Sequence, residues 1–186
     1  MSASEDVRAF VALELDAEVQ KAIAELVAGL RPGVSRARWV RPEGLHLTLR
    51  FLGSSSPKQI ASLRPALAAA AAACGPARAR VAGLGTFPQR GRPRVLWLGI
   101  ALPRPVLDLQ AACEVAAVAA GFPPEARPFR SHLTLARFRD SAPRPDLPSA
   151  DLGTARLETL VLLRSDLRPG GAVYSAIDRL ALGGAE

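Results

Sequence analysis

Hydrophobic positions along the chain follow two periods. In three segments they recur every three or four residues, which predicts helices over 17–30, 57–73 and 103–120. Elsewhere, short apolar stretches bounded by turn residues predict strands. These strands cover 7–15, 38–41, 45–53, 77–87, 95–100, 131–137, 155–164 and 172–182. A segment rich in Pro, Asp and Ser, 140–153, predicts a surface loop.

The order of these elements repeats. A strand, a helix and a strand that contains a histidine come near the start of the chain, and the same order returns from residue 95. This repeat predicts an α+β fold of two antiparallel sheets flanked by helices, in which two pseudo-symmetric lobes enclose a central cleft. At 186 residues the chain suits one such fold, and we predict a single domain over 1–186.

The tetrapeptide His-Leu-Thr-Leu occurs twice, with His46 and Thr48 in the first copy and His132 and Thr134 in the second. Strand side chains alternate between faces, so each histidine shares a face with its threonine. One copy alone is compatible with a half-buried strand whose polar side chains bond to their neighbours. The two copies hold both histidines of the chain, however, and Val or Ile would serve a strand core better. We therefore interpret the pair as functional.

Two imidazoles that face one cleft suit acid–base catalysis, because their ordinary pKa lies near neutrality. One can take a proton from water while the other protonates a leaving oxygen, and the threonine hydroxyls can donate to an anionic oxygen between them. This arrangement fits a phosphodiester. Two histidines without adjacent carboxylates or thiols make a poor metal site, so we expect neither a metal nor another cofactor. The sequence also contains no Gly-x-Ser-x-Gly elbow and no phosphate-binding Gly-x4-Gly-Lys loop.

The formal net charge of +7 suggests an anionic partner such as nucleic acid. Nearly all of the positive charge is arginine, which a bias in base composition also explains, so the charge alone supports nucleic acid only modestly. Segment 88–94 is a basic stretch without an acidic residue. Cys74 and Cys113 form no CxxC pair, and no apolar run reaches about 18 residues. The first six residues contain no basic region that leads into an apolar segment, so we expect no signal peptide. We expect a reduced, cytoplasmic protein that is not bound to a membrane, with both cysteines in the core.

The stretches His46-Leu-Thr-Leu-Arg-Phe-Leu-Gly53 and His132-Leu-Thr-Leu-Ala-Arg137 resemble the two signatures of the 2H phosphoesterase superfamily. They are most similar to its RNA 2′,3′-cyclic phosphodiesterases, also called 2′-5′ RNA ligases. Stretches 8–13, 38–40, 95–99 and 165–174 resemble that family too. The resemblance implies a bilobal α+β fold with the site between the lobes, and hydrolysis of a ribose 2′,3′-cyclic phosphate to a 2′-phosphomonoester. It further implies that His46 is the proton donor and His132 the proton acceptor.

Two arginines follow the motifs. Arg137 matches the family's arginine that helps to hold the phosphate, and a solvated rim arginine is the alternative. Strict alternation would turn Arg137 away from His132, so its place in the site needs a bulge or a strand end. Arg50 shares the parity of His46 and could approach the cleft. We nevertheless expect Arg50 to be a solvated arginine at the rim.

Three aromatic side chains are harder to place. Phe87 lies beside the basic stretch and is a candidate for substrate binding by stacking on a base. A contact in the apolar core suits Phe87 at least as well. We expect Trp39 and Trp97 to lie in the core.

Three activities stay open. Hydrolysis of RNA 2′,3′-cyclic phosphate ends is the leading one. A ligase that forms 2′-5′ linkages, for example on tRNA fragments, would run the same chemistry in reverse. An RNA-binding module would keep the cleft without turnover, and the presence of both His-Thr pairs disfavours it. As partner we expect RNA or an oligonucleotide with a 2′,3′-cyclic phosphate end, bound by a monomer.

Overall fold

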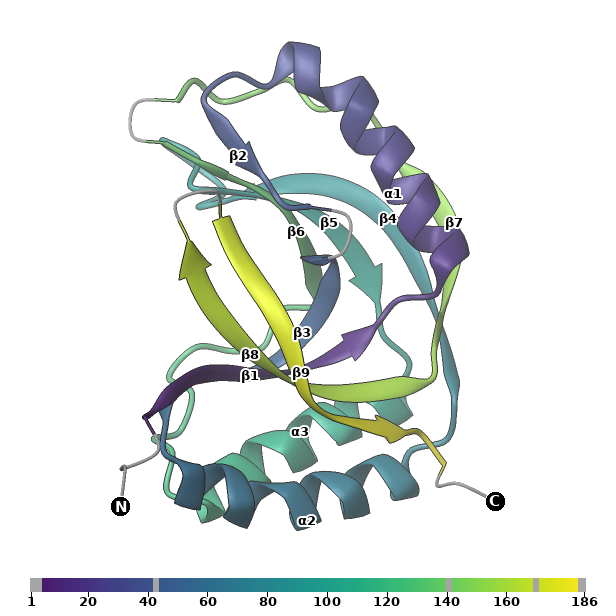
Figure 1. Cartoon of the computed structure of the whole chain (residues 1–186). Coiled ribbons are helices and arrows are strands. Elements are labelled where there is room, and N and C mark those ends of the chain that lie inside the picture. The colour runs from purple at the N-terminus through teal and green to yellow at the C-terminus, as the bar shows by residue number, and fades with distance from the viewer. Residues whose placement is uncertain (1–4, 42–43, 140–141, 169–170, 184–186) are drawn as a thin grey trace.

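Two antiparallel sheets with helices packed against them make up the fold (Figure 1). The computed structural model describes residues 5–41, 44–139, 142–168 and 171–183. From edge to edge, the first sheet contains β3 (His46–Ser55), β1 (Val7–Glu14), β8 (Thr159–Arg168) and β9 (Gly171–Ala181). The second sheet contains β2 (Ala37–Trp39), β6 (His132–Phe138), β5 (Val95–Ala101), β4 (Ala77–Phe87) and β7 (Asp151–Leu157).

The helices agree with the predicted ones. They are α1 (Ala17–Leu30), which continues into a short 3-10 turn, η1 (Arg31–Gly33), then α2 (Pro57–Ala73) and α3 (Arg104–Ala119). Local capping sets two of the starts. The Asp16 carboxylate accepts the Val19 N–H at 3.0 Å, and Ser56 forms a reciprocal capping box with Gln59.

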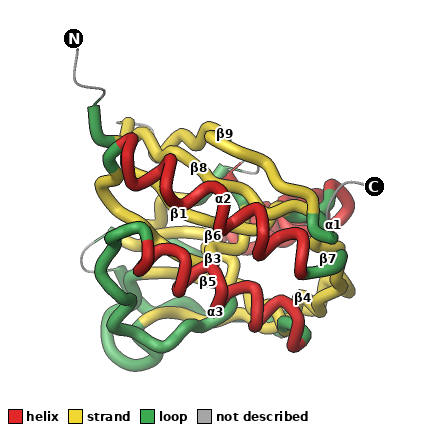
Figure 2. The backbone as a smooth tube through the Cα atoms, turned by 90° about the horizontal axis from the view of Figure 1, so that it is seen from below, coloured by secondary structure: helices red, strands yellow, loops and turns green. Residues whose placement is uncertain are grey.

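The two halves of the fold exchange their helices. α1 follows β1 of the first sheet but packs against β7 of the second, where the Asp16 carboxylate accepts the Arg156 N–H at 2.6 Å. α3 follows β5 of the second sheet but lies beside α2 beneath the first (Figure 2), where Gln110 donates to the Leu49 carbonyl at 3.4 Å. The predicted bilobal α+β fold is confirmed, and its two halves share one continuous core.

The last third of the chain departs from the predicted elements. The strand predicted over 155–164 is two strands, β7 and β8, and β7 begins inside the loop predicted over 140–153. Residues 140 and 141 of that loop lie outside the described residues. The chain leaves the second sheet at Leu157 and enters the first at Thr159. Leu157 and Leu160 are both fully buried, each in its own sheet, so the apolar pattern runs on across the break.

Both cysteines lie in the core, as predicted. Cys74 and Cys113 are buried and unpaired, and burial raises the pKa of the Cys113 thiol to about 12. Nowhere in the described ranges do three His, Cys, Asp or Glu side chains gather in a group that could hold a metal ion. Of the helices that the structure describes, none has the length and apolar character needed to cross a membrane.

Candidate active site

A bulge in β6 turns Arg137 toward the cleft. The pairing of β6 with β5 shifts register between Thr134 and Ala136, which leaves Leu135 as an extra residue. Leu135 and Ala136 are both fully buried. Arg137 therefore lies on the same face as His132. This is the bulge that a place for Arg137 in the site requires.

β3 has a bulge at the same place in its motif. Its pairing with β1 skips Leu49, and both Leu49 and Arg50 are buried. Phe51 consequently takes the position on the cleft face and is 47% exposed. The matching bulges make Phe51 the counterpart of Arg137.

Arg50 is not a solvated rim arginine, so that prediction was wrong. It is 6% exposed, forms an ion pair with Glu114 of α3, and donates to the carbonyls of Phe51 and Pro123. Glu114 also accepts the Glu125 N–H at 2.9 Å. This group fastens the first motif to α3 and to the loop that leads to the second motif. Strict alternation would place Arg50 on the cleft face, and the bulge at Leu49 turns it to the buried face instead.

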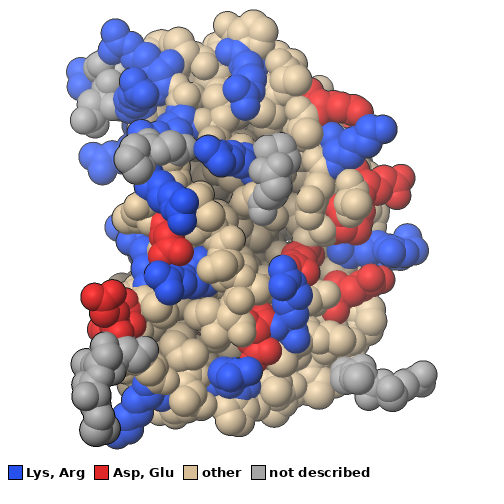
Figure 3. Space-filling view, viewed as in Figure 1, with Lys and Arg blue, Asp and Glu red and all other residues tan. Residues whose placement is uncertain are grey.

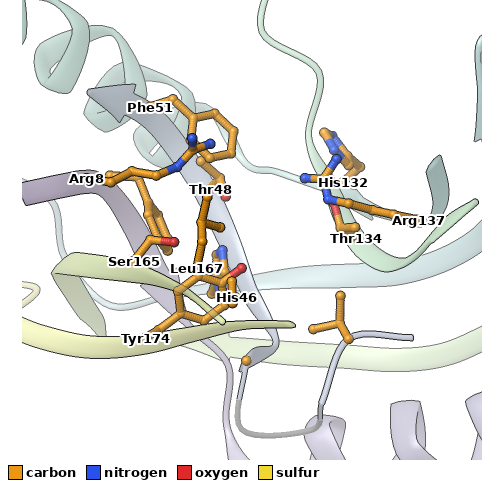
Figure 4. A pocket seen from close by; sticks show the side chains of 14 residues that line it. Arg8, His46, Thr48, Phe51, His132, Thr134, Arg137, Ser165, Leu167 and Tyr174 are labelled. Carbon is orange, nitrogen blue, oxygen red and sulfur yellow. The ribbon is translucent and has the colours of Figure 1, made fainter. Parts of the chain in front are cut away.

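The two motifs meet at one pocket with a volume of about 200 Å³ (Figure 4). His46 and Thr48 line it from the first sheet, and His132, Thr134 and Arg137 line it from the second. The close view places these two groups on opposite sides of the pocket. The fold thus brings together the five residues that the motifs marked as candidates.

Each histidine ring is held by the backbone two residues before it. Nδ1 of His132 lies 2.7 Å from the carbonyl oxygen of Arg130. A carbonyl oxygen can only accept, so Nδ1 carries a proton, and in the neutral ring the lone pair is on Nε2. The His46 ring likewise makes a hydrogen bond to the backbone of Gly44.

Aromatic rings surround His46. Its ring centroid lies 4.6 Å from that of Phe10 and 5.0 Å from that of Tyr174, which meets it edge-on. Burial lowers the pKa of His46 to about 4, and the hydrogen bond to Gly44 opposes this shift only in part. Without a bound anion, His46 is therefore neutral at pH 7.

Phe87 and Trp97 form a row of rings behind His132. Phe87 meets His132 edge-on with centroids 5.1 Å apart, and Trp97 lies 5.4 Å from Phe87. A Cβ atom at Gly85 would overlap the Trp97 ring, so only glycine there lets the indole lie against the strand. Trp97 is thus half-buried beside the site and not in the core as predicted, whereas Trp39 does pack against the core.

Three further residues line the pocket although their residue patterns suggested no role for them. Arg8 comes from β1, Ser165 from β8 and Tyr174 from β9 (Figure 4). Ser165 is buried, and Arg8 is exposed. No local pattern marks these positions, and the similarity of their stretches to the family is the signal that points to them.

Comparisons with known proteins agree with this geometry. The family model described as LigT like Phosphoesterase matches residues 13–97. A Thermus thermophilus protein named RNA 2′,3′-cyclic phosphodiesterase is 35% identical over 185 residues, which cover 96% of this chain and 91% of that protein. The chain belongs to the LigT-like phosphoesterase family. The resemblance drawn from the two motifs is confirmed.

Other LigT-like proteins match over nearly the whole chain. The crystal structure of E. coli LigT complexed with 3′-AMP superposes with a TM-score of 0.83 at 27% identity, covering 96% of this chain and 99% of that one. A Methanothermobacter thermautotrophicus protein named RNA 2′,3′-cyclic phosphodiesterase is 29% identical over 179 residues, covering 92% of this chain and 97% of that protein. The family's fold accordingly extends over both halves of the molecule.

Proposed function

We propose that this LigT-like phosphoesterase hydrolyses RNA ends that carry a 2′,3′-cyclic phosphate and leaves a 2′-phosphomonoester. The observation that carries the proposal is the placement of His46 and Thr48 opposite His132 and Thr134 around one pocket. The relatives named as RNA 2′,3′-cyclic phosphodiesterases support the choice of substrate. A net charge of +7 suits an anionic polymer.

In this mechanism His132 is the general base. Its Nδ1–H is engaged by the Arg130 carbonyl, so the neutral ring offers the Nε2 lone pair to a water molecule in the pocket. Removal of the water proton produces the nucleophile that attacks phosphorus in line with the leaving O3′. The new P–O bond forms as the P–O3′ bond breaks, and the phosphate stays on O2′.

His46 is the general acid that protonates O3′, and its surroundings must change before it can do so. With a pKa of about 4 it holds almost no proton at pH 7. The cyclic phosphate carries a negative charge, and an anion beside the ring stabilises the imidazolium and raises its pKa. Substrate binding therefore brings the proton onto His46. The acid is charged only when a phosphate is there to be cleaved.

Thr48, Thr134 and Arg137 stabilise the phosphate as its charge grows. The two hydroxyls donate from opposite sides, and the planar guanidinium presents forked donors that match two phosphate oxygens. Charge on these oxygens increases in the transition state, so the contacts strengthen there and accelerate the chemical step.

Phe51 is the better platform for the terminal base. Its ring is 47% exposed on the cleft face, and stacking of a base on an aromatic ring contributes about 1–3 kcal/mol. Phe87 packs between His132 and Trp97 and also lines a wider cavity beside the pocket. A contact between Phe87 and a base stays a prediction, and its packing supports the His132 ring.

We infer that the chain acts as a single-domain monomer in the cytoplasm. The two motifs and their neighbours in the pocket come from one chain, so a second copy has no residue to add to the His-Thr pairs. The two buried, unpaired cysteines suit a reducing compartment.

Incubation of the pure protein with a nucleoside 2′,3′-cyclic phosphate tests the proposal. We expect a 2′-phosphomonoester, recognised by phosphorus NMR and by resistance to a 3′-specific phosphatase, and we expect activity to survive chelation. A predominantly 3′-phosphate product would exchange the roles of His46 and His132. Binding of RNA without turnover would favour the RNA-binding module, and joining to an RNA with a 5′-hydroxyl end would favour the ligase.

A further inference from the structure

A second and wider cavity opens from the catalytic pocket. Its volume is about 1090 Å³, compared with about 200 Å³ for the pocket. Both are lined by Thr48, Phe51, His132, Thr134 and Arg137, so they are continuous. We call the wider cavity the arginine groove. It runs between the β4–β5 loop, 88–94, and the segment 125–130, with α3 and the bulge of β3 as its floor.

The catalytic pocket is too small to hold more than the end of an RNA chain. Cavities that enclose a small organic ligand usually measure about 300–1,000 Å³. At about 200 Å³ the pocket holds the reacting phosphate and adjoining ribose atoms but no longer piece of RNA. The RNA chain that leads to the cyclic phosphate must therefore leave the pocket, and the groove adjoins the pocket at residues of both motif strands.

Hydrogen bonds fix both walls of the groove. On one side, Arg144 donates to the carbonyls of Pro88 and Gly91 at 3.0 and 2.9 Å, which holds the β4–β5 loop. On the other, Glu114 of α3 accepts the Glu125 N–H at 2.9 Å. The groove is thus formed in the protein alone, so binding does not have to order its walls.

The lining of the groove is positively charged. Five arginines and two glutamates line it, and one arginine and one glutamate, Arg50 and Glu114, neutralise each other. Within the described part of the chain, no carboxylate forms an ion pair with Arg94 or Arg127. Arg130 lies over the Phe87 ring, 5.9 Å from its centroid. Lys and Arg side chains also gather toward the upper left of the face drawn in Figure 3.

We propose that the arginine groove binds the single-stranded RNA that lies 5′ of the cyclic phosphate, with Arg94 and Arg127 contacting backbone phosphates from opposite walls. This inference rests on the proposed function and specifies its substrate as a polynucleotide end. Contacts in the groove form only when further phosphates are present. They strengthen binding of substrate and transition state alike and therefore raise kcat/KM for RNA over that for a mononucleotide.

The same loop supplies a matched control. The sequence groups Arg90, Arg92 and Arg94 in one basic stretch, but only Arg94 lines the groove. Arg90 and Arg92 are exposed elsewhere on the loop. Replacing Arg90 and Arg92 with Gln removes as much charge as replacing Arg94 and Arg127 with Gln. Comparing the two double variants therefore distinguishes the effect of contacts in the groove from the effect of a lower net charge.

The experiment compares kcat/KM on cytidine 2′,3′-cyclic phosphate and on a short single-stranded RNA with the same end. For the Arg94→Gln, Arg127→Gln variant we expect a loss of roughly tenfold on RNA and less than about twofold on the mononucleotide. For the Arg90→Gln, Arg92→Gln variant we expect less than about twofold on either. The salt dependence of RNA binding should flatten by about 1.4 in log–log slope, because each phosphate contact to a single strand contributes about 0.7.

Several outcomes would overturn the groove assignment. They are equal losses from the two double variants, equal losses on both substrates, and a wild-type protein that does not prefer RNA. If the wild type hydrolyses neither substrate, the proposed function fails, and calorimetric titration with the RNA still tests the groove: the Arg94→Gln, Arg127→Gln variant must bind more weakly than the control. Competition by polyglutamate that equals competition by RNA would make the occupant an acidic peptide and reject the RNA path.

Discussion

The two motif strands are near copies in sequence and backbone, yet they present different side chains to the cleft. β3 and β6 both bulge after the motif threonine. β3 then buries Arg50 and presents Phe51, whereas β6 buries Ala136 and presents Arg137. The repeat fixes the two His-Thr pairs, and the residues that follow each bulge are where the copies differ. The Phe51 ring on one side and the Arg137 guanidinium on the other make the two sides of a pseudo-symmetric cleft chemically different.

The histidines differ as well. His46 is enclosed by Phe10 and Tyr174 and lines only the catalytic pocket. His132 rests against Phe87 and lines both the pocket and the arginine groove. The same tetrapeptide thus holds one imidazole that burial keeps neutral and one that also lines the wider groove. The roles proposed for them therefore depend on neighbouring residues that lie outside the motif.

Replacing either histidine should have the largest effect. His46→Ala and His132→Ala should each lower kcat by roughly 10²-fold or more, the usual contribution of a positioned acid or base. In the pH profile of kcat, loss of the base should abolish the acidic limb and loss of the acid the basic limb. Circular dichroism checks that both variants fold. Near-normal turnover in one variant would remove that histidine from the mechanism.

The positions after the bulges come next. Arg137→Gln should lower kcat by up to about 10²-fold, because it removes charged donors from the transition state. Phe51→Leu should mainly raise KM, by about tenfold, because it removes a stacking surface. Steady-state kinetics on a nucleoside 2′,3′-cyclic phosphate separates the two patterns. If the two variants change kcat and KM in the same way, Phe51 and Arg137 do not have the different functions expected here.

Arg50, which the bulge in β3 buries, should contribute to the free energy of unfolding through its ion pair with Glu114. Removing one partner of a buried ion pair costs about 3–5 kcal/mol, and since the Glu114 side chain is 26% exposed we expect about 2 kcal/mol for Arg50→Met. Denaturant unfolding measures this loss. The double variant Arg50→Met, Glu114→Leu should recover most of it, because no charge is then left without its partner. A double variant as unstable as the single one would rule out the pair as the cause.

The last prediction concerns the proton on His46. His46 has a pKa of about 4 against an ordinary 6.5, so between pH 6.5 and 4 the unfolded chain binds a proton that the folded one does not. This contribution to stability is present above pH 6.5 and is lost as pH falls toward 4, and His46→Gln should remove that part of the pH dependence. Because the chain has only two histidines, NMR titration can follow each ring. A His46 pKa near 6.5, or one that phosphate does not raise, would contradict the burial argument.

Hydrophobic periodicity and turn residues are local signals in the sequence, so they predict structure that depends on neighbouring residues of the chain. The three helices and the strands through β6 follow from them, as do the two His-Thr pairs. The bulges do not, because Leu49 and Leu135 are apolar at positions where a buried residue is expected in any case. The misplacement of Arg50 and the omission of Phe51 both follow from that. The partner of Arg50 is on a helix from the other half of the fold, and no local pattern encodes such a contact.

The row of rings behind His132 gives the protein a built-in optical probe. Gly85 lets the Trp97 indole lie against the sheet, and Phe87 separates that indole from the imidazole. The other tryptophan of the chain, Trp39, packs against the core and lies under the Arg31 guanidinium, which is 5.5 Å from its ring centroid. Of the two emitters of intrinsic fluorescence, Trp97 is thus the one that reaches a motif histidine through a row of ring contacts. Emission from Trp97 should respond when a nucleotide enters, so occupancy can be read without attaching a dye.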